Sequence, residues 1–388
     1  MVAVATAGPL RVRGQWAELV LTGRSLLDRA LAVWQRWDAL WYQRIAQQGY
    51  RADDGSTAFF PLYPLAARAL AWVLGGRIVI AELLLSSAAF VVAMVLLHRL
   101  VRLECARGAI GPSTRRAAPR GRRPPPAEAP TTEPGAIADA SVWALALFPV
   151  AFFFHAPYTE SVFLALTIAA LLCAREGRAW TAGALALLAA TARTQGALLA
   201  LPLGWELARE RRRAGRPIAP ALIASLLPVL GALLVGVYFR RVVGVHGSAL
   251  ETQGLWGYAL TPPWESLLDS VYHITSGGDP ARGSMPWVEA INLTCLLGFT
   301  MLAIAGLRRL PATYSLYTLP SLAILYLRDM SFSPLMSVSR FTLVLFPCFM
   351  LAAPWLARRR AVAVAWLALA GLAQSALFAY WTRWGFVA

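Results

Sequence analysis

The chain has 388 residues, of which 58% are hydrophobic and 14% are charged, and its formal net charge is +16. A typical soluble domain carries about 25% charged residues, so this composition excludes an ordinary soluble fold. All the basic residues are arginines, and they stand in short clusters between apolar runs, where they set membrane topology. This placement argues against a nucleic-acid partner, as does the lack of a pattern of basic and aromatic residues that could form a groove for single-stranded nucleic acid.

Apolar runs divide the chain into predicted helices, and a helix that spans a membrane needs roughly 20 apolar residues. The first run, 15–35, is interrupted by Arg24, Asp28 and Arg29, and it predicts a tilted span or an interfacial helix. The run 78–101 predicts an uninterrupted span. Further helices are predicted near 139–156, 160–174, 180–192, 196–208, 218–238, 287–307, 312–327, 341–356 and 361–381.

Two long segments between these runs are predicted to be loops. Residues 102–138 include RRAAPRGRRPPPAEAPTTEPG, and this content of Pro and Arg predicts a disordered loop. Residues 240–286 predict a long polar loop. The expected fold class is therefore all-α, a polytopic transmembrane helical bundle with about 10–11 membrane helices in one integral domain over 1–388.

The arginine clusters predict the orientation of this bundle. Threading the runs in order puts four clusters on one side, which the positive-inside rule identifies as cytoplasmic. Arg240 and Arg241 are the main exception. We therefore expect a multi-pass protein of a bacterial plasma membrane, with its active site on the external face. The four clusters are Arg115–Arg123, Arg209–Arg216, Arg308–Arg309 and Arg358–Arg360.

The segment WQRWDALWYQRIAQQGY is the strongest candidate for chemistry on that face. Asp38 lies between Trp37 and Trp41, and tryptophans favour the membrane interface. A carboxylate at this level is partly desolvated and suits general-base catalysis. The alternatives for Asp38 are a helix cap or an ion pair with Arg36 or Arg44.

The next two external segments are FFPLYPLAARAL (59–70) and HAPYTES (155–161). Two prolines in the first segment predict a chain break before a short interfacial helix, which forms a groove wall or simply packs. In the second segment, Glu160 either orients a substrate hydroxyl or caps the next helix beside Thr159.

Two arginines at membrane level are candidates for binding phosphate. Arg193 in ARTQG separates two apolar runs, and Arg340 in SVSRF begins another. Ionisable residues at such depths are costly and are therefore functional candidates. A guanidinium makes bidentate contacts with phosphate, although both side chains can instead reach to the interface.

Metal and nucleotide sites are not expected. The four cysteines and four histidines lack metal-ligand spacing, and neither a Walker A loop nor GxGxxG is present. The pair Asp53-Asp54 is only weakly similar to a DxD metal sequence. No cofactor or metal ligand is therefore assigned, and a divalent metal stays an open alternative.

Five segments, taken in order, resemble the PIG-V-like mannosyltransferases. They are WDALWYQRIAQQGY, AFFPLYPLAARAL, ALALFPVAFFFHAPYTESVFLALT, ARTQGALLALPL and SVSRFTLVLFPCFMLAA. The resemblance covers most of 34–356 and implies a GT-C type glycosyltransferase with a polyprenyl-phosphate sugar donor. The family uses an Asp in the first external loop as its base, and Asp38 matches that position. The weak first span and the Arg-rich linker depart from the pattern and leave the acceptor open.

The prediction is an inverting glycosyltransferase that moves a hexose, mannose by resemblance, from a polyprenyl-phosphate donor to an acceptor hydroxyl. Asp38 is the expected base, and Arg340 and Arg193 are expected to bind the donor phosphate. The expected partners are the donor, a lipid, glycan or protein acceptor, and membrane lipids. The open alternatives are a transporter or flippase of lipid-linked sugars, and a non-catalytic subunit of an envelope-assembly complex. Residues expected to contact substrate are Trp37, Trp41, Tyr42, Tyr158, Glu160 and Gln195.

Overall fold

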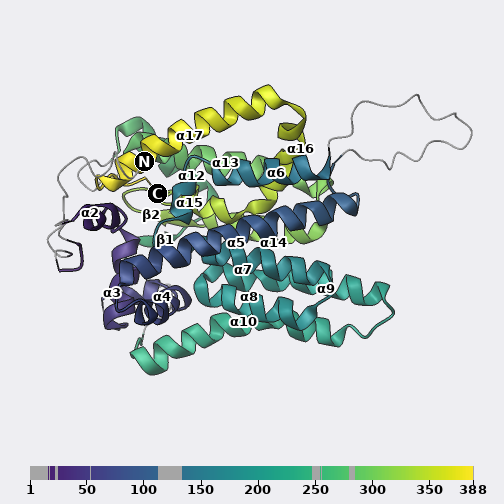
Figure 1. Ribbon diagram of the computed structural model, residues 1–388, viewed down its shortest axis with the longest axis horizontal. Coiled ribbons are helices and arrows are strands. Elements are labelled where there is room, and N and C mark those ends of the chain that lie inside the picture. Colours follow the sequence, from purple (N-terminus) through teal and green to yellow (C-terminus); the bar gives the residue numbers. More distant parts are fainter. Residues whose placement is uncertain are drawn as a thin grey trace, which may run out of the picture.

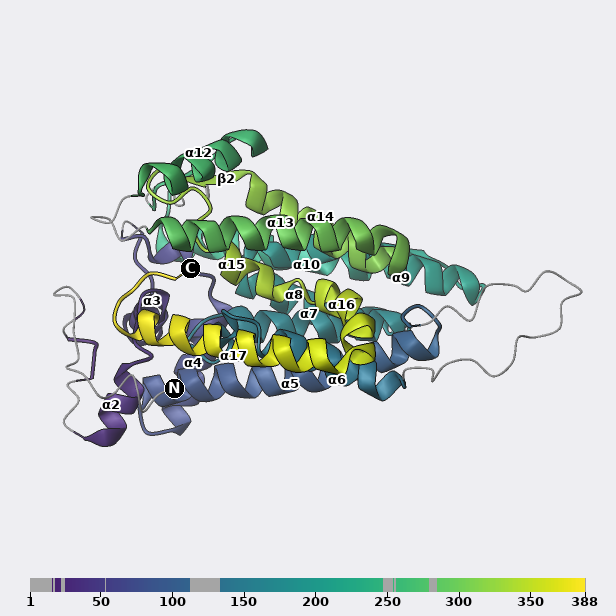
Figure 2. The ribbon, with the colours of Figure 1, turned by 90° about the horizontal axis from the view of Figure 1, so that it is seen from above.

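A computed structural model describes residues 16, 18–21, 25–52, 54–111, 133–246, 254, 256–278 and 285–387. The described chain is almost entirely helical, and its long helices run back and forth along one axis (Figures 1 and 2). The α-helices are α2 (Leu26–Ala32), α3 (Asp38–Gln48), α4 (Leu62–Val73), α5 (Ile78–Ala106), α6 (Pro134–Ala146), α7 (Glu160–Arg175), α8 (Ala179–Ala192), α9 (Ala200–Arg213), α10 (Ala219–Tyr238), α12 (Pro263–Ser276), α13 (Pro286–Arg309), α14 (Ala312–Tyr326), α15 (Val338–Phe341), α16 (Phe346–Arg358) and α17 (Arg360–Thr382).

Shorter elements connect these helices. Four are 3-10 helices, η2 (Ser56–Ala58), η3 (Ala151–Phe154), η4 (Thr194–Leu199) and η7 (Thr342–Val344), and η5 (Phe239–Val243) is a π-helix. The strands β1 (Tyr258–Leu260) and β2 (Arg328–Met330) pair antiparallel, with Ala259 opposite Asp329.

Four described helices are long and apolar enough to cross a membrane: α5, α10 with η5 (Ala219–Val243), α13 and α17. A fifth is reached if α15 with η7 and α16, which are bent by 75°, count as one span. Large apolar side chains such as Val95, Leu233 and Leu369 are more than 60% exposed on these helices, as expected for contact with lipid. The chain is therefore a helical membrane protein.

The number of described helices that are long enough to cross a membrane is lower than the 10–11 that the sequence predicts, because several apolar runs form shorter helices. α7, α8 and α14 have 16, 14 and 15 residues, short of the roughly 20 that a straight span needs. The predicted run 139–156 breaks after α6, just before Pro149, which cannot donate a helical hydrogen bond. In the described part of the first run the α-helix is α2, seven residues with a Ser25–Asp28 capping box, which is too short to cross a membrane.

The described arginine clusters lie at one end of the bundle. α9 and α13 end at this end with Arg211–Arg213 and Arg308–Arg309, and α16 meets α17 there at Arg358–Arg360 (Figures 1 and 2). The cluster Arg115–Arg123 lies outside the described residues. The opposite end holds α3, α4, α15 and both strands (Figure 1). We call these the arginine-rich end and the site end.

The two predicted loops are partly structured. α5 continues to Ala106 and α6 begins at Pro134, so helices occupy both edges of 102–138. The segment 240–286 contains β1 and α12, and the pairing of β1 with β2 ties this segment to the end of α14. A three-residue strand carries no periodicity that a sequence pattern can reveal.

A buried polar network braces four helices at the arginine-rich end. Arg175 on α7 donates through Nε and Nη2 to Glu104 on α5, at 2.6 and 2.7 Å, and through Nη1 to Glu206 on α9 at 2.6 Å. Tyr314 on α14 donates to Glu104 at 2.8 Å, and Thr313 donates to Glu206. Since each charged side chain here is at most 2% exposed, every charge depends on its partners.

Candidate functional site

Four charged side chains from four separate segments meet at the site end. Arg340 on α15 places Nη1 2.6 Å from Asp38 Oδ2 and Nε 3.2 Å from Glu160 Oε1. Arg193 places Nη1 2.6 Å from the same Glu160 oxygen. We call Asp38, Arg340, Glu160 and Arg193 the charged cluster. It unites the predicted base, both predicted phosphate ligands and one predicted substrate contact.

Local backbone geometry fixes two members of the cluster. Trp37, directly before Asp38, has φ 53°, and Ser337, which precedes α15, has φ 66°. Left-handed backbone is unusual for a bulky side chain such as that of Trp37, and such strain concentrates at functional sites. Asp38 and Glu160 are the first residues of α3 and α7, where the helix dipole favours a negative charge.

The members of the cluster differ in their access to solvent. The side chains of Glu160, Arg340 and Arg193 are 2%, 9% and 11% exposed, whereas that of Asp38 is 29% exposed. Only one Asp38 oxygen contacts Arg340, and a carboxylate has about four acceptor positions. Asp38 therefore keeps a free face from which it can accept a proton.

The alternatives considered for Asp38 and Glu160 differ from what the structure shows. Arg36 donates to the carbonyl oxygens of Ala32, Gln35 and Thr382, and Arg44 pairs with Asp54, so neither pairs with Asp38. The α7 N-terminus has no side-chain cap, and Glu160 instead accepts from Arg193 and lies 3.2 Å from Arg340 Nε as an ion pair.

Aromatic side chains surround the charged cluster. Tyr158 stacks on Phe153, lies 5.0 Å from the Arg340 guanidinium and donates to the Arg36 carbonyl at 3.2 Å. Burial raises the pKa of Tyr158 well above its ordinary value, so this phenol stays neutral and acts by packing and hydrogen bonding.

Of the other predicted aromatic contacts, Tyr42 lies beside Tyr158, whereas Trp41 and Trp37 pack on other aromatic rings. Tyr42 packs on the rings of Tyr158 and Tyr63, and Trp41 stacks on Phe59 with centroids 5.6 Å apart. The predicted short helix is present as α4, which begins inside FFPLYP at Leu62 and carries Tyr63, so this segment forms an aromatic wall. Trp37 packs edge-on against Trp384 and Phe386, which follow α17.

No side-chain interaction within the described residues ties Gln195, the last predicted substrate contact, to the cluster. Its side chain is buried in η4, and its Oε1 has no hydrogen-bond partner within the described residues. Asp53 lies outside the described residues. Within the described ranges, no group of three or more His, Cys, Asp or Glu side chains is arranged to hold a metal ion.

Arg328 on β2 is a further site residue that sequence reasoning missed. Its guanidinium lies 4.0 Å from the Tyr258 ring and 5.1 Å from the Phe341 ring. Arg193 and Arg340 lie 4.9 and 5.0 Å from the same Phe341 ring. Burial lowers the pKa of Arg328, and no carboxylate among the described residues pairs with it. The pairing of β1 with β2 brings Arg328 here, and no local pattern announces that pairing.

Replacing Gly196 by Ala is expected to lower the free energy of unfolding by about 1–3 kcal/mol, as overpacking does. A Cβ at Gly196 would lie 2.3 Å from the backbone nitrogen of Ala190, so η4 would have to move away from α8. Arg193 would move with it. Thermal unfolding checks this against Gly298→Ala, since a Cβ at Gly298 meets nothing within 4 Å. Equal unfolding temperatures for the two variants would contradict the packing argument.

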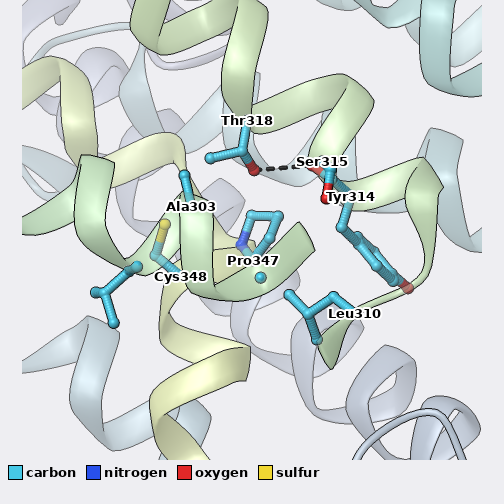
Figure 3. A pocket seen from close by; sticks show the side chains of 9 residues that line it. Ala303, Leu310, Tyr314, Ser315, Thr318, Pro347 and Cys348 are labelled. Carbon is cyan, nitrogen blue, oxygen red and sulfur yellow. Dashed lines mark hydrogen bonds between the residues drawn. The ribbon is translucent and has the colours of Figure 1, made fainter. Parts of the chain in front are cut away.

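A small cavity elsewhere has none of the properties of this site. It is enclosed by α13, α14 and α16, with Tyr314, Thr318 and Cys348 in its wall (Figure 3). Its free volume of about 10 Å³ holds roughly one water molecule. Its lining contains neither a carboxylate nor an arginine.

The fold and the charged cluster define a helical membrane protein with an aromatic-lined ionic site at one end of its bundle. No protein-family model, curated protein or solved structure matches this chain.

Proposed function

We propose that this chain is a membrane glycosyltransferase that transfers a sugar from a polyprenyl-phosphate donor to an acceptor hydroxyl, with inversion at the anomeric carbon. The observation that carries the proposal is the contact of a partly exposed carboxylate, Asp38, with a buried arginine, Arg340. General-base catalysis needs such a carboxylate, and a phosphate leaving group needs cations nearby. The resemblance to PIG-V-like enzymes suggests mannose and the GT-C type.

The proposal includes the topology that the apolar runs predict. We place 10–11 helices in the membrane, so that α7, α8 and α14 cross it inside the bundle with the help of η3, η4 and the ends of neighbouring helices. The arginine-rich end then faces the cytoplasm. The site end faces outward, where a lipid-linked sugar is the available donor.

The proposed reaction uses the charged cluster in one step. The acceptor oxygen attacks the sugar C1, a new C1–O bond forms, and the C1–O bond to the polyprenyl phosphate breaks on the opposite face. Asp38 takes the proton of the acceptor hydroxyl. The phosphate leaves with the bonding electron pair, and because it is stable as an anion it needs no general acid.

The balance of charge at the site supports an anionic ligand. Arg193, Arg328 and Arg340 surround Phe341, and the carboxylates within the charged cluster are those of Asp38 and Glu160. One positive charge is therefore in excess. Arg328, which has no carboxylate partner among the described residues, supplies it and is proposed to bind the donor phosphate together with Arg340 and Arg193.

A transporter of lipid-linked sugars is the competing function. Transporters commonly hold their substrate near the middle of the membrane, where half-helices meet. Here the charged cluster lies among α3, α15 and the start of α7, at one end of the long helices (Figure 1). This position favours the transferase.

The two functions differ in one testable respect: a transferase breaks the bond between the sugar and the polyprenyl phosphate, and a transporter does not. Purified protein in nanodiscs would receive polyprenyl-phosphate mannose labelled in the sugar, together with a crude membrane acceptor. The transferase releases free polyprenyl phosphate and labels the acceptor, and both products are measured by chromatography. Intact donor that crosses a vesicle bilayer with no free polyprenyl phosphate would instead establish the transporter.

Replacing Arg328 by Gln is expected to raise the KM for the donor by about 10-fold or more, the effect of losing a charge-assisted hydrogen bond to phosphate. The matched control is Arg383→Gln, an exposed arginine just after α17 at the same end. Steady-state kinetics with varied donor check the difference. Equal donor KM values for the two variants would remove Arg328 from the phosphate site.

A further inference from the structure

A second basic site lies at the opposite end of the bundle, where α5 and α9 end and α14 begins. Its hollow has a volume of about 480 Å³, which is within the range of small-ligand sites. Its lining includes four arginines and one glutamate: Arg107, Arg175, Arg209, Arg213 and Glu210. We call it the arginine hollow. Pro311, directly before α14, also lines it, so the positive end of that helix dipole adjoins the hollow.

The carboxylates around the arginine hollow do not balance its arginines. Glu104 and Glu206 lie beneath it, but Arg175, Tyr314 and Thr313 already donate to them. Glu210 lies 3.5 Å from the exposed Arg213. Even when all three carboxylates are counted, one arginine is in excess among the described residues.

Among the described residues, Arg209 has no carboxylate within hydrogen-bond distance. Its Nη1 is 3.9 Å from Glu206 Oε2, beyond hydrogen-bond distance, and its Nε is buried with no hydrogen-bond partner among the described residues. A buried guanidinium nitrogen without an acceptor is costly, so the site is incomplete as it stands. Arg107 adds to this, because within the described residues its side chain donates only to the Arg175 carbonyl, from Nη2 at 2.8 Å.

We infer that the arginine hollow binds a phosphate group, supplied either by the headgroup of an anionic phospholipid or by free phosphate. Guanidinium groups are preferred partners of phosphate. The hollow adjoins the end of the candidate span α5 at the arginine-rich end, where lipid headgroups are expected. The bound phosphate accepts from Arg209 and Arg107 and neutralises the excess charge. This inference is independent of the proposed transferase activity.

The lipid arm of the test uses the full-length protein in nanodiscs of phosphatidylglycerol and phosphatidylcholine, with retained lipid counted by native mass spectrometry. Wild type is expected to retain phosphatidylglycerol, and Arg209→Gln about 10-fold less. Arg213→Gln, at an exposed position, gives a second variant if Arg209→Gln does not fold. The control is Arg212→Gln, an exposed neighbour on α9 that does not line the hollow.

The free-anion arm titrates inorganic phosphate against chloride at constant ionic strength, in a neutral detergent, and follows the unfolding temperature. A rise with phosphate that wild type shows and Arg209→Gln lacks would assign the site to free phosphate. Selective loss of phosphatidylglycerol by Arg209→Gln would assign it to a lipid headgroup. The inference is overturned if neither probe distinguishes wild type from Arg209→Gln, or if Arg212→Gln loses as much lipid.

Discussion

Asp38→Asn is expected to lower the turnover of sugar transfer by about 10²–10⁴-fold, the contribution that a general base typically makes. The amide keeps the shape of the carboxylate but cannot take the proton of the acceptor hydroxyl. Arg340 still has Glu160 as a partner at 3.2 Å, so the charged cluster stays paired and the bundle stays folded. Steady-state kinetics and thermal unfolding, measured on the same nanodisc preparation, check both parts.

Asp54→Asn is the matched control for this change. Asp54 is also an ion-paired aspartate close to α3, but its partner is Arg44 and it lies outside the charged cluster. It is expected to keep near-normal turnover. If Asp54→Asn were as inactive as Asp38→Asn, the loss would come from a general disturbance of this end of the bundle.

Arg175→Met is expected to lower the free energy of unfolding by about 3–5 kcal/mol, because it leaves two buried carboxylates without their cation. Arg175 donates to both Glu104 and Glu206, and these side chains are fully buried. The variant loses the hydrogen bonds that join α7 to α5 and α9, and it also loses the positive charge that neutralises the two carboxylates. Denaturant or thermal unfolding in a fixed detergent measures the change.

Arg178→Met is the comparison for Arg175→Met. Arg178 is 58% exposed and lies 3.4 Å from Glu176, so its loss is expected to cost less than about 1 kcal/mol. Adding Glu104→Gln and Glu206→Gln to Arg175→Met removes the uncompensated charge and should recover part of the stability. Similar losses for Arg175→Met and Arg178→Met would contradict a buried ionic brace.

Uninterrupted apolar runs predict their helices within a few residues. The run 78–101 corresponds to α5 at Ile78–Ala106, 218–238 to α10 at Ala219–Tyr238, and 361–381 to α17 at Arg360–Thr382. Length and hydropathy are sufficient there, because lipid requires every backbone group of a span to bond within the helix. A proline inside a run does not decide the outcome alone, since α10 continues through Pro228 whereas the helix in the run 139–156 ends before Pro149.

The sequence predicts the members of the charged cluster but not the bonds between them. Trp-flanked Asp38, the turn with Glu160, and the arginines at 193 and 340 each stand out locally, since a charge beside an apolar run is unusual. The partnership of Asp38 with Arg340 joins residues 302 apart, and no local spacing encodes it. The place of Arg328 depends on the pairing of two three-residue strands. The place of Arg209 depends on where the ends of three helices meet. Neither position can be predicted before the fold is known.

The central claim is that Asp38 takes the acceptor proton as a lipid-linked sugar is transferred. The most direct measurement follows labelled mannose from polyprenyl-phosphate mannose to a membrane acceptor, with purified wild type and Asp38→Asn assayed side by side. Transfer by wild type that a folded Asp38→Asn lacks is the predicted result. Near-normal transfer by Asp38→Asn would contradict the claim.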